Sequence, residues 1–174
     1  MIQIKIFPLN GIEIENIGII RLGDTRTVIE ETLGNPDSSS NATQLYYDDY
    51  ELRIDLNQNN RIEFIEFTHG PFPEKTKLNL YGIDPFQVGA EQLVEILTEK
   101  NQGEIDLSEV NYNFSFLNIS VGIWRQFTVD DIQQSITEMK DCHEYEKNKN
   151  WLLADLDKAK NFWTISIGEK NYYQ

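Results

Sequence analysis

The chain has 174 residues, of which 40% are hydrophobic and 11% aromatic. This apolar content is enough to build a core, which argues against an intrinsically disordered protein. The formal net charge is −14, and acids exceed bases in each of the segments 1–70, 71–127 and 128–174. Because phosphate groups are bound by clustered Lys and Arg, this charge argues against nucleic acid and anionic membranes as partners. It fits a basic protein partner, or it serves solubility alone.

Nothing in the sequence indicates a targeting or membrane segment. Residues 1–7 alternate in the manner of a β-strand, and no apolar stretch approaches the roughly 20 residues that span a bilayer. The single cysteine, Cys142, cannot form a disulfide within the chain, which is typical of a reducing compartment. We therefore expect a cytoplasmic protein.

The first part of the chain predicts strands followed by a helix. Residues 1–21 have the alternation of a strand or hairpin, with an Asn-Gly turn signal between two runs. The helix that follows is capped by Asp24 or Thr25 and stopped by Gly34. Its apolar face consists of Val28, Ile29 and Leu33. Residues 37–41 are predicted to form a polar loop.

Three strands are predicted next, over residues 44–47, 50–57 and 61–67. Asparagine tolerates positive φ, so a tight turn centred on Asn59 and Asn60 joins the last two strands. The apolar face of this hairpin then pairs Leu52 with Phe67, Ile54 with Ile65 and Leu56 with Glu63. The polar face pairs Arg53 with Glu66 and Asp55 with Phe64, and it also carries Ile62. A turn shifted back by one residue would place Glu51 against Glu66, so the first register is preferred.

A second unit of the same kind follows a connection rich in proline and glycine at residues 70–87. A helix is predicted over residues 90–100, with Leu93, Val94 and Leu97 facing inward. Alternating runs at residues 112–116 and 119–123 differ in phase, so a turn or bulge is expected between them. Residues 22–67 and 88–127 thus have the same helix-plus-strands pattern, which indicates an internal duplication.

The last part of the chain is predicted to be mainly helical. Thr128 and Asp131 have the spacing of a capping box, a second helix is expected after Asn150, and an aromatic strand closes the chain at residues 162–168. The predicted fold class is α+β, with helices packed on a mainly antiparallel sheet. We expect one domain over residues 1–174. Its parts are a first unit at 1–70, a second unit at 71–127, and a helical segment with closing strand at 128–174.

The inventory of metal ligands is poor, and we expect no metal and no cofactor. The chain has only two histidines and one cysteine, and Cys142 and His143 are adjacent, so on a helix they would point about 100° apart. A nucleophilic pair would require His69 to reach Cys142. His143 also continues an apolar helical stripe, so we interpret it as a residue at the rim of the core.

Two pairs of carboxylates are the other candidates for chemistry. Asp48-Asp49 and Asp130-Asp131 could bind a hard cation or divide acid and base roles. The first pair equally suits a β-turn and the second a helix N-terminus, and we prefer these structural interpretations. No Gly-rich phosphate loop, nucleophile elbow or HExxH helix is present. No motif therefore indicates an enzyme.

One predicted surface combines aromatic and charged side chains in the way that a recognition surface for a basic, partly apolar partner would. Most of it lies on the polar face of the hairpin over residues 50–67. The candidate binding residues are Tyr47, Asp49, Glu51, Arg53, Asp55, Phe64, Glu66 and Trp124. The N-terminal strand or a C-terminal helix could instead cover this face.

A short stretch resembles a known repeat. Leu22-Gly23-Asp24-Thr25, then Val28, then Leu33-Gly34-Asn35-Pro36 follow the "LG-x-T, V, LG-x-P" pattern of β-lactamase-inhibitor-like tandem helix-plus-sheet proteins and of related outer-membrane-assembly lipoproteins. The second unit lacks both the threonine and the Gly-x-Pro stop, and the chain has no lipoprotein signal. The chain is also similar to small acidic bacterial proteins, some of which are immunity proteins to toxins. These resemblances imply binding or inhibition, with no catalytic residue to carry over.

Three hypotheses follow. The first is a non-enzymatic protein-binding module, an acidic inhibitor or immunity protein for a basic partner. The second is a small-ligand-binding protein or enzyme with a cleft between the two units, which would contain convergent polar groups and a perturbed pKa. The third is a self-associating structural protein with a large apolar interface.

Overall fold

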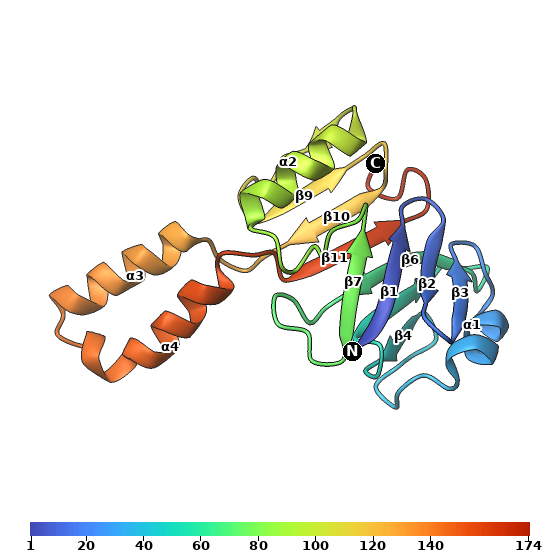
Figure 1. Ribbon diagram of the computed structural model, residues 1–174, viewed down its shortest axis with the longest axis horizontal. Coiled ribbons are helices and arrows are strands. Elements are labelled where there is room, and N and C mark those ends of the chain that lie inside the picture. The colour runs from blue at the N-terminus through green and yellow to red at the C-terminus, as the bar shows by residue number, and fades with distance from the viewer.

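The structure is a computed structural model that describes residues 1–174 as two β-sheets and four helices (Figure 1). The first sheet has the strand order β3-β2-β1-β7. Its strands are β1 (Ile2–Phe7), β2 (Gly11–Ile14), β3 (Gly18–Arg21) and β7 (Thr76–Leu80). Only the β1–β7 pair is parallel. The predicted N-terminal hairpin is confirmed, and β3 extends it by one strand.

The second sheet is fully antiparallel and has the order β4-β5-β6-β11-β10-β9-β8. Its first half consists of β4 (Gln44–Tyr47), β5 (Leu52–Leu56) and β6 (Ile62–Phe67). Its second half consists of β11 (Thr164–Gly168), β10 (Val121–Trp124), β9 (Asn113–Phe116) and β8 (Ile105–Asp106). Together with the helices, these sheets confirm the predicted α+β class.

The helices are α1 (Arg26–Leu33), α2 (Ala90–Asn101), α3 (Val129–Asp141) and α4 (Tyr145–Lys158). Figure 1 shows the first sheet over the β4–β6 half of the second sheet, and α2 over β9 and β10. One core cluster of 28 buried residues joins both sheets with α1 and α2. The helical hairpin of α3 and α4 projects away from this body (Figure 1).

The two helix-plus-strands units occupy opposite halves of the second sheet, and their strands follow each other in opposite directions across it. The first unit runs α1-β4-β5-β6 and the second runs α2-β9-β10-β11, with the short strand β8 added at the edge. The last strands of the two units, β6 and β11, pair at the centre of the sheet. The predicted boundary at residue 127 leaves out β11, because the α3–α4 hairpin separates it in sequence from the rest of its unit.

The register of the β5–β6 hairpin agrees with the prediction except at its turn. Leu52 lies opposite Phe67, Arg53 opposite Glu66, Ile54 opposite Ile65 and Asp55 opposite Phe64. A bulge between Asp55 and Leu56 then places Leu56 opposite Ile62 instead of Glu63. The bulge lets Ile62 enter the core and removes the carboxylate of Glu63 from an apolar partner. The expectation that Ile62 lies on the polar face was therefore wrong.

The start of α3 follows its sequence signal, whereas the start of α4 and the buried face of α1 differ from the prediction. Thr128 and Asp131 form the predicted capping box, in which the Thr128 hydroxyl accepts the N–H of Asp131 at 3.2 Å. Val28 was expected on the apolar face of α1 but is exposed, because it lies about 100° around the helix from Ile29, which forms the buried i, i+4 pair with Leu33. The helix expected after Asn150 begins at Tyr145.

The turn between α3 and α4 corrects the interpretation of His143. Both Cys142 and His143 are exposed there, and His143 has φ 63°. This left-handed conformation ends α3 and turns the histidine away from the apolar stripe. His143 is therefore not a residue at the rim of the core.

The outer edge of β4 is closed by the polar loop at residues 37–41. The Asp37 N–H donates to the Tyr46 carbonyl at 2.9 Å, and the Tyr46 N–H donates to the Ser40 hydroxyl at 2.8 Å. The Asn41 side-chain oxygen accepts the N–H of Gln44 at 2.9 Å. These bonds use backbone groups that an edge strand otherwise leaves free.

Phe67 and Val28 offer a test of this core. Phe67 lies fully buried in the core cluster, so Phe67→Ala should lower the free energy of unfolding by about 3–5 kcal/mol. Val28→Ala, at an exposed helical position, should change it by less than about 0.5 kcal/mol. Urea denaturation followed by circular dichroism measures both. Equal losses in the two variants would contradict the packing described here.

Candidate functional site

The face of the second sheet that points away from the core carries most of the predicted binding residues. Side chains alternate along a strand, so burial of Leu52, Ile54 and Leu56 in the core turns Arg53 and Asp55 to the opposite face. We call this surface the back face. Its central residues are Arg53, Asp55, Glu66, Trp124, Thr164 and Ser166.

Strand pairing brings these residues together from both units. Arg53 on β5 lies opposite Glu66 on β6, and Glu66 lies opposite Ser166 on β11. Ser166 in turn lies opposite Gly122 on β10, and the next pair on the same face is Trp124 with Thr164. The back face is therefore one continuous surface across the join between the units.

Arg53 lies between two carboxylates, and we call this group the acidic end of the back face. Its Nη1 is 3.2 Å from Glu66 Oε2, and its Nε is 3.0 Å from Asp55 Oδ1. Both atoms of the second contact are buried, and they form a close ion pair that is poorly aligned as a hydrogen bond. Burial of these charges costs desolvation free energy, which the ion pairs offset.

The electrostatics of the acidic end favour an additional cation. Burial raises the pKa of both Asp55 and Glu66, and the positive charge of Arg53, with side-chain hydrogen bonds of Gln44 to Asp55 and of Thr164 to Glu66, counteracts this only in part. Asp55 also raises the pKa of Glu66 by charge repulsion. One guanidinium thus serves two desolvated carboxylates, and a second positive group beside them would stabilise their charged forms.

The other end of the back face is aromatic. The Trp163 ring makes edge-on contacts with Trp124, at 6.0 Å between ring centroids, and with Phe127, at 4.7 Å. We call Trp124, Phe127 and Trp163 the aromatic end. Trp124 remains 39% exposed, so its apolar surface is available to another molecule.

Part of the back face is covered by the C-terminal segment, residues 169–174, and not by the N-terminal strand or a helix. The Tyr172 ring stacks on Phe64 with 4.8 Å between centroids, and the Tyr173 and Ser166 hydroxyls are 2.7 Å apart. Gly122 makes this possible, because a Cβ there would collide with the Tyr173 hydroxyl. Burial raises the pKa of Tyr173. Phe64 is therefore buried and is not available as a contact residue.

Three further predicted residues, Tyr47, Asp49 and Glu51, do not lie on the back face. Tyr47 pairs with Leu52, so it shares the core face, where its hydroxyl donates to the Gly34 carbonyl at 3.3 Å. Burial, and after it the charge of Glu30, raises its pKa to about 12. The alternation that predicted its position does not continue through the β4–β5 turn, where Glu51 has φ 52°.

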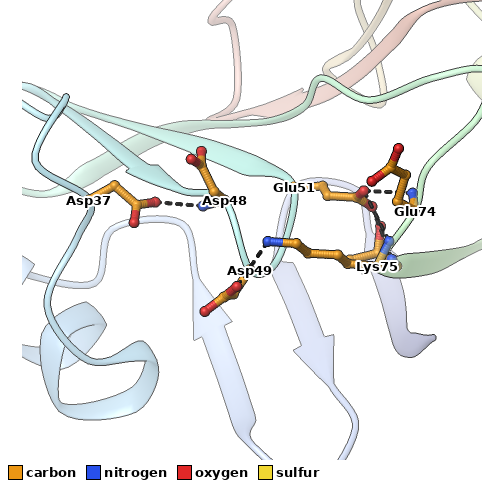
Figure 2. Close-up of polar contacts among 7 residues, drawn as sticks. Asp37, Asp48, Asp49, Glu51, Glu74 and Lys75 are labelled. Atoms are coloured by element: carbon orange, nitrogen blue, oxygen red, sulfur yellow. Dashed lines mark hydrogen bonds and ion pairs between the residues drawn. The ribbon is translucent and has the colours of Figure 1, made fainter.

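Glu51 has a structural role, shown in Figure 2. Its side chain is buried, with 3% of the residue exposed, and its carboxylate accepts the N–H groups of Glu74, Lys75 and Thr76 at 2.7–3.0 Å. It also accepts the Thr76 hydroxyl. Burial acts to raise the pKa of Glu51, but these hydrogen bonds together outweigh it and the pKa is lowered. Glu51 fixes the chain that enters β7.

The Asp48-Asp49 pair also has structural contacts. The Asp48 N–H donates to Asp37 at 2.6 Å, and exposed Asp49 pairs with Lys75 at 2.9 Å (Figure 2). Nowhere in the chain do three His, Cys, Asp or Glu side chains converge as a metal site would require. His69 contacts the hydroxyl of neighbouring Thr68.

A hollow of about 460 Å³ lies beside the second unit, between the N-termini of α2 and α3. Arg125 lines it, and its guanidinium donates to the carbonyls of Asn111 and Ala159 at 2.7 and 3.3 Å. Charges of both signs, among them Glu91, Asp130 and Lys160, complete the lining, which contains no histidine or cysteine. The hollow therefore does not lie between the two units, where a cleft was expected.

Five residues contribute to the back face or to its cover without having been predicted from the sequence: Phe127, Trp163, Thr164, Tyr172 and Tyr173. The aromatic pairs near the C-terminus were a signal, but their place depends on β11 pairing with both β6 and β10.

No helix of the structure has the length and apolar character needed to cross a membrane. No family model, curated protein or solved structure matches the chain.

Glu51 gives a prediction with a defined pH dependence. Because the carboxylate holds four hydrogen bonds, Glu51→Gln should lower the free energy of unfolding at pH 7 by about 2–3 kcal/mol. The folded pKa is below the unfolded value, so this stabilisation is present above the unfolded pKa and is lost as the pH falls through the folded pKa. The difference between wild type and variant should therefore shrink below about pH 4.

Urea denaturation at several pH values measures this difference. Asp49→Asn is the matched control, since Asp49 pairs with the same loop but is exposed, and we expect little change from it. A Glu51→Gln loss that stayed constant down to pH 2 would show that the carboxylate charge does not contribute.

Proposed function

We propose that this chain is a non-enzymatic binding protein, an acidic inhibitor or immunity protein that acts on a basic protein in the cytoplasm, and that the back face is its contact surface. The observation that carries the proposal is the acidic end, where Asp55 and Glu66 share the single guanidinium of Arg53 at 3.0 and 3.2 Å. The two carboxylate side chains keep 13% and 17% of their surface exposed, so a Lys or Arg side chain of a partner that lies over them would balance the second negative charge.

The aromatic end supports the same proposal. Residues that dominate binding energy are most often Trp, Tyr and Arg at the centre of an interface, and exposed Trp124 lies on the back face with Arg53. The net charge of −14 would accelerate encounter with a basic protein. The arrangement of the chain as two joined units agrees with the resemblance to tandem inhibitor-like scaffolds.

The alternative function is a small-ligand-binding protein or enzyme. The hollow beside Arg125 has a volume typical of ligand sites. However, the Arg125 guanidinium already donates to two backbone carbonyls, and no histidine or cysteine lines the hollow. We therefore prefer protein binding.

Trp124→Ala tests the proposed surface. Wild type, Trp124→Ala and the control Ile19→Ala are immobilised and exposed to lysate of the source cells. Ile19 is exposed on the first sheet, so its loss should not matter. We expect wild type and Ile19→Ala to retain the same basic protein, and Trp124→Ala to bind it about 30-fold more weakly, as for a typical interface anchor.

Salt dependence tests the charge argument with the purified partner. Raising ionic strength from about 50 to 500 mM should weaken binding at least about tenfold, chiefly through the association rate, because charges near the rim are screened. Calorimetry and stopped-flow mixing measure the two quantities. An acidic partner, a salt-independent affinity, or equal binding by Trp124→Ala and Ile19→Ala would refute the proposal.

A further inference from the structure

The proposed contact surface is largely covered in this structure. The side chains of Asp55 and Glu66 are only 13% and 17% exposed. Phe64 and Ser166 lie on the same face and are 5% and 6% exposed, although neither belongs to the core cluster. A partner that binds the centre of the back face therefore requires a movement that uncovers it.

Residues 170–174 form this cover, and we call them the strap. The Tyr172 ring stacks on Phe64 with 4.8 Å between centroids, and the Tyr173 ring meets Phe64 edge-on at 6.5 Å. The Tyr173 hydroxyl also lies 2.7 Å from the Ser166 hydroxyl. The two tyrosines thus account for the burial of residues that the core does not contact.

The strap also adjoins the acidic end. The Arg53 guanidinium lies 5.4 Å from the centroid of the ring on which Tyr172 stacks. Burial raises the pKa of Tyr172, and the negative charge of Asp55 adds to this rise. Burial likewise raises the pKa of Tyr173, and the charge of Glu66 adds to it. A side chain that approaches both carboxylates from outside therefore meets the strap.

The strap is attached to the sheet by side chains and not by its main chain. The preceding residue, Glu169, is fixed at both ends, because its N–H and its carbonyl bond to β6 and to the chain before β10, each at 2.8 Å. Beyond Glu169 the backbone hydrogen bonds are local turns, from Tyr172 to Glu169 and from Gln174 to Asn171, at 3.0 and 3.1 Å. The strap can therefore open as a unit without breaking any strand pairing.

Two glycines make room for the tyrosines. A Cβ at Gly122 would lie 2.4 Å from the Tyr173 hydroxyl, and a Cβ at Gly168 would lie 2.6 Å from the Tyr172 Cβ. Neither glycine has a positive φ, so the backbone conformation alone does not require glycine there. The absence of a side chain instead permits a close approach. The back face therefore contains a groove that fits aromatic side chains.

We propose that the strap is a removable cover of the back face, which competes with the basic partner for this groove and opens when that partner binds. This inference rests on the proposed function. In the closed form the tyrosines occupy the groove, and in the open form Phe64, Ser166 and the acidic end are accessible. Because only the open form binds, the observed affinity is reduced by the fraction of molecules that are open.

Gly122→Ala opens the strap in the full chain. The new methyl group takes the place of the Tyr173 hydroxyl, and the other near atom, Ser166 Oγ at 2.8 Å, ends a side chain that can rotate. Backbone relaxation measured by NMR should show residues 171–174 ordered in wild type and mobile in the variant. Calorimetry with the purified basic partner should show about tenfold tighter binding by the variant.

A second variant removes the contacts of the strap itself. Tyr172→Ser/Tyr173→Ser should tighten binding by a similar factor. Tyr81→Ala is the matched control, because Tyr81 is 41% exposed against 39% for Tyr172 but follows β7 in the first sheet, and its affinity should equal that of wild type. All three variants should keep one cooperative thermal transition. A mobile strap with unchanged or weaker binding would overturn the proposal.

A further test adds the strap as a separate peptide. A peptide of residues 169–174, blocked at both ends, is titrated into isotope-labelled Tyr172→Ser/Tyr173→Ser protein. A tethered strap with an effective concentration of a few mM, closed about ten times more often than open, corresponds to a peptide Kd of about 0.1–1 mM. We expect NMR shifts at Phe64, Gly122 and Ser166, and none in wild type, whose groove is filled. A peptide with both tyrosines replaced by serine should not bind, and absence of shifts with the native peptide would contradict a separable strap.

The outcomes separate the two proposals. If wild type binds the basic partner and neither opened variant binds it more tightly, the strap does not compete with that partner, and the proposed function stands. If neither wild type nor the opened variants bind a basic protein, the proposed function fails and the competing role of the strap fails with it. The peptide titration does not involve the partner, so it tests the groove in either case.

Discussion

The pairing of β6 with β11 is the interaction on which the rest of the structure depends. It joins the last strand of each unit, and it sets Ile65 against Ile167 and Phe67 against Ile165 in the core. The same alternation places Glu66 and Ser166 on the opposite face. One antiparallel contact therefore closes the hydrophobic core and also assembles the polar surface from residues that are 100 positions apart in sequence.

The back face combines features that a stable, isolated sheet does not need. For stability alone, Arg53 paired with one carboxylate, or apolar residues in place of Arg53, Asp55 and Glu66, would serve as well or better. Instead, two desolvated carboxylates share Arg53, and exposed Trp124 lies on the same face. Tyr172 and Tyr173 cover the neighbouring apolar patch around Phe64, and of the central residues of the back face only Trp124 is exposed.

Local sequence patterns predicted local structure, whereas the positions of residues with distant partners depend on long-range strand pairing. The Arg53–Glu66 register could be predicted because one turn and one apolar stripe determine it. Tyr47 and Glu51 were misplaced because the left-handed turn at Glu51 resets the alternation, and because the partners of its carboxylate lie at residues 74–76. The role of Tyr173 depends on Ser166 and Gly122, whose proximity follows only from the pairing of β11 with β10.

The loop that closes β4 limits how this sheet can meet other molecules. At that edge the loop already occupies backbone donors and acceptors, and the opposite edge strand, β8, spans only two residues. Neither edge offers a long row of free peptide groups for a foreign strand to extend the sheet. Molecules that approach this sheet therefore encounter its side chains and not its main chain, so discrimination among them depends on the residues displayed on its flat surface.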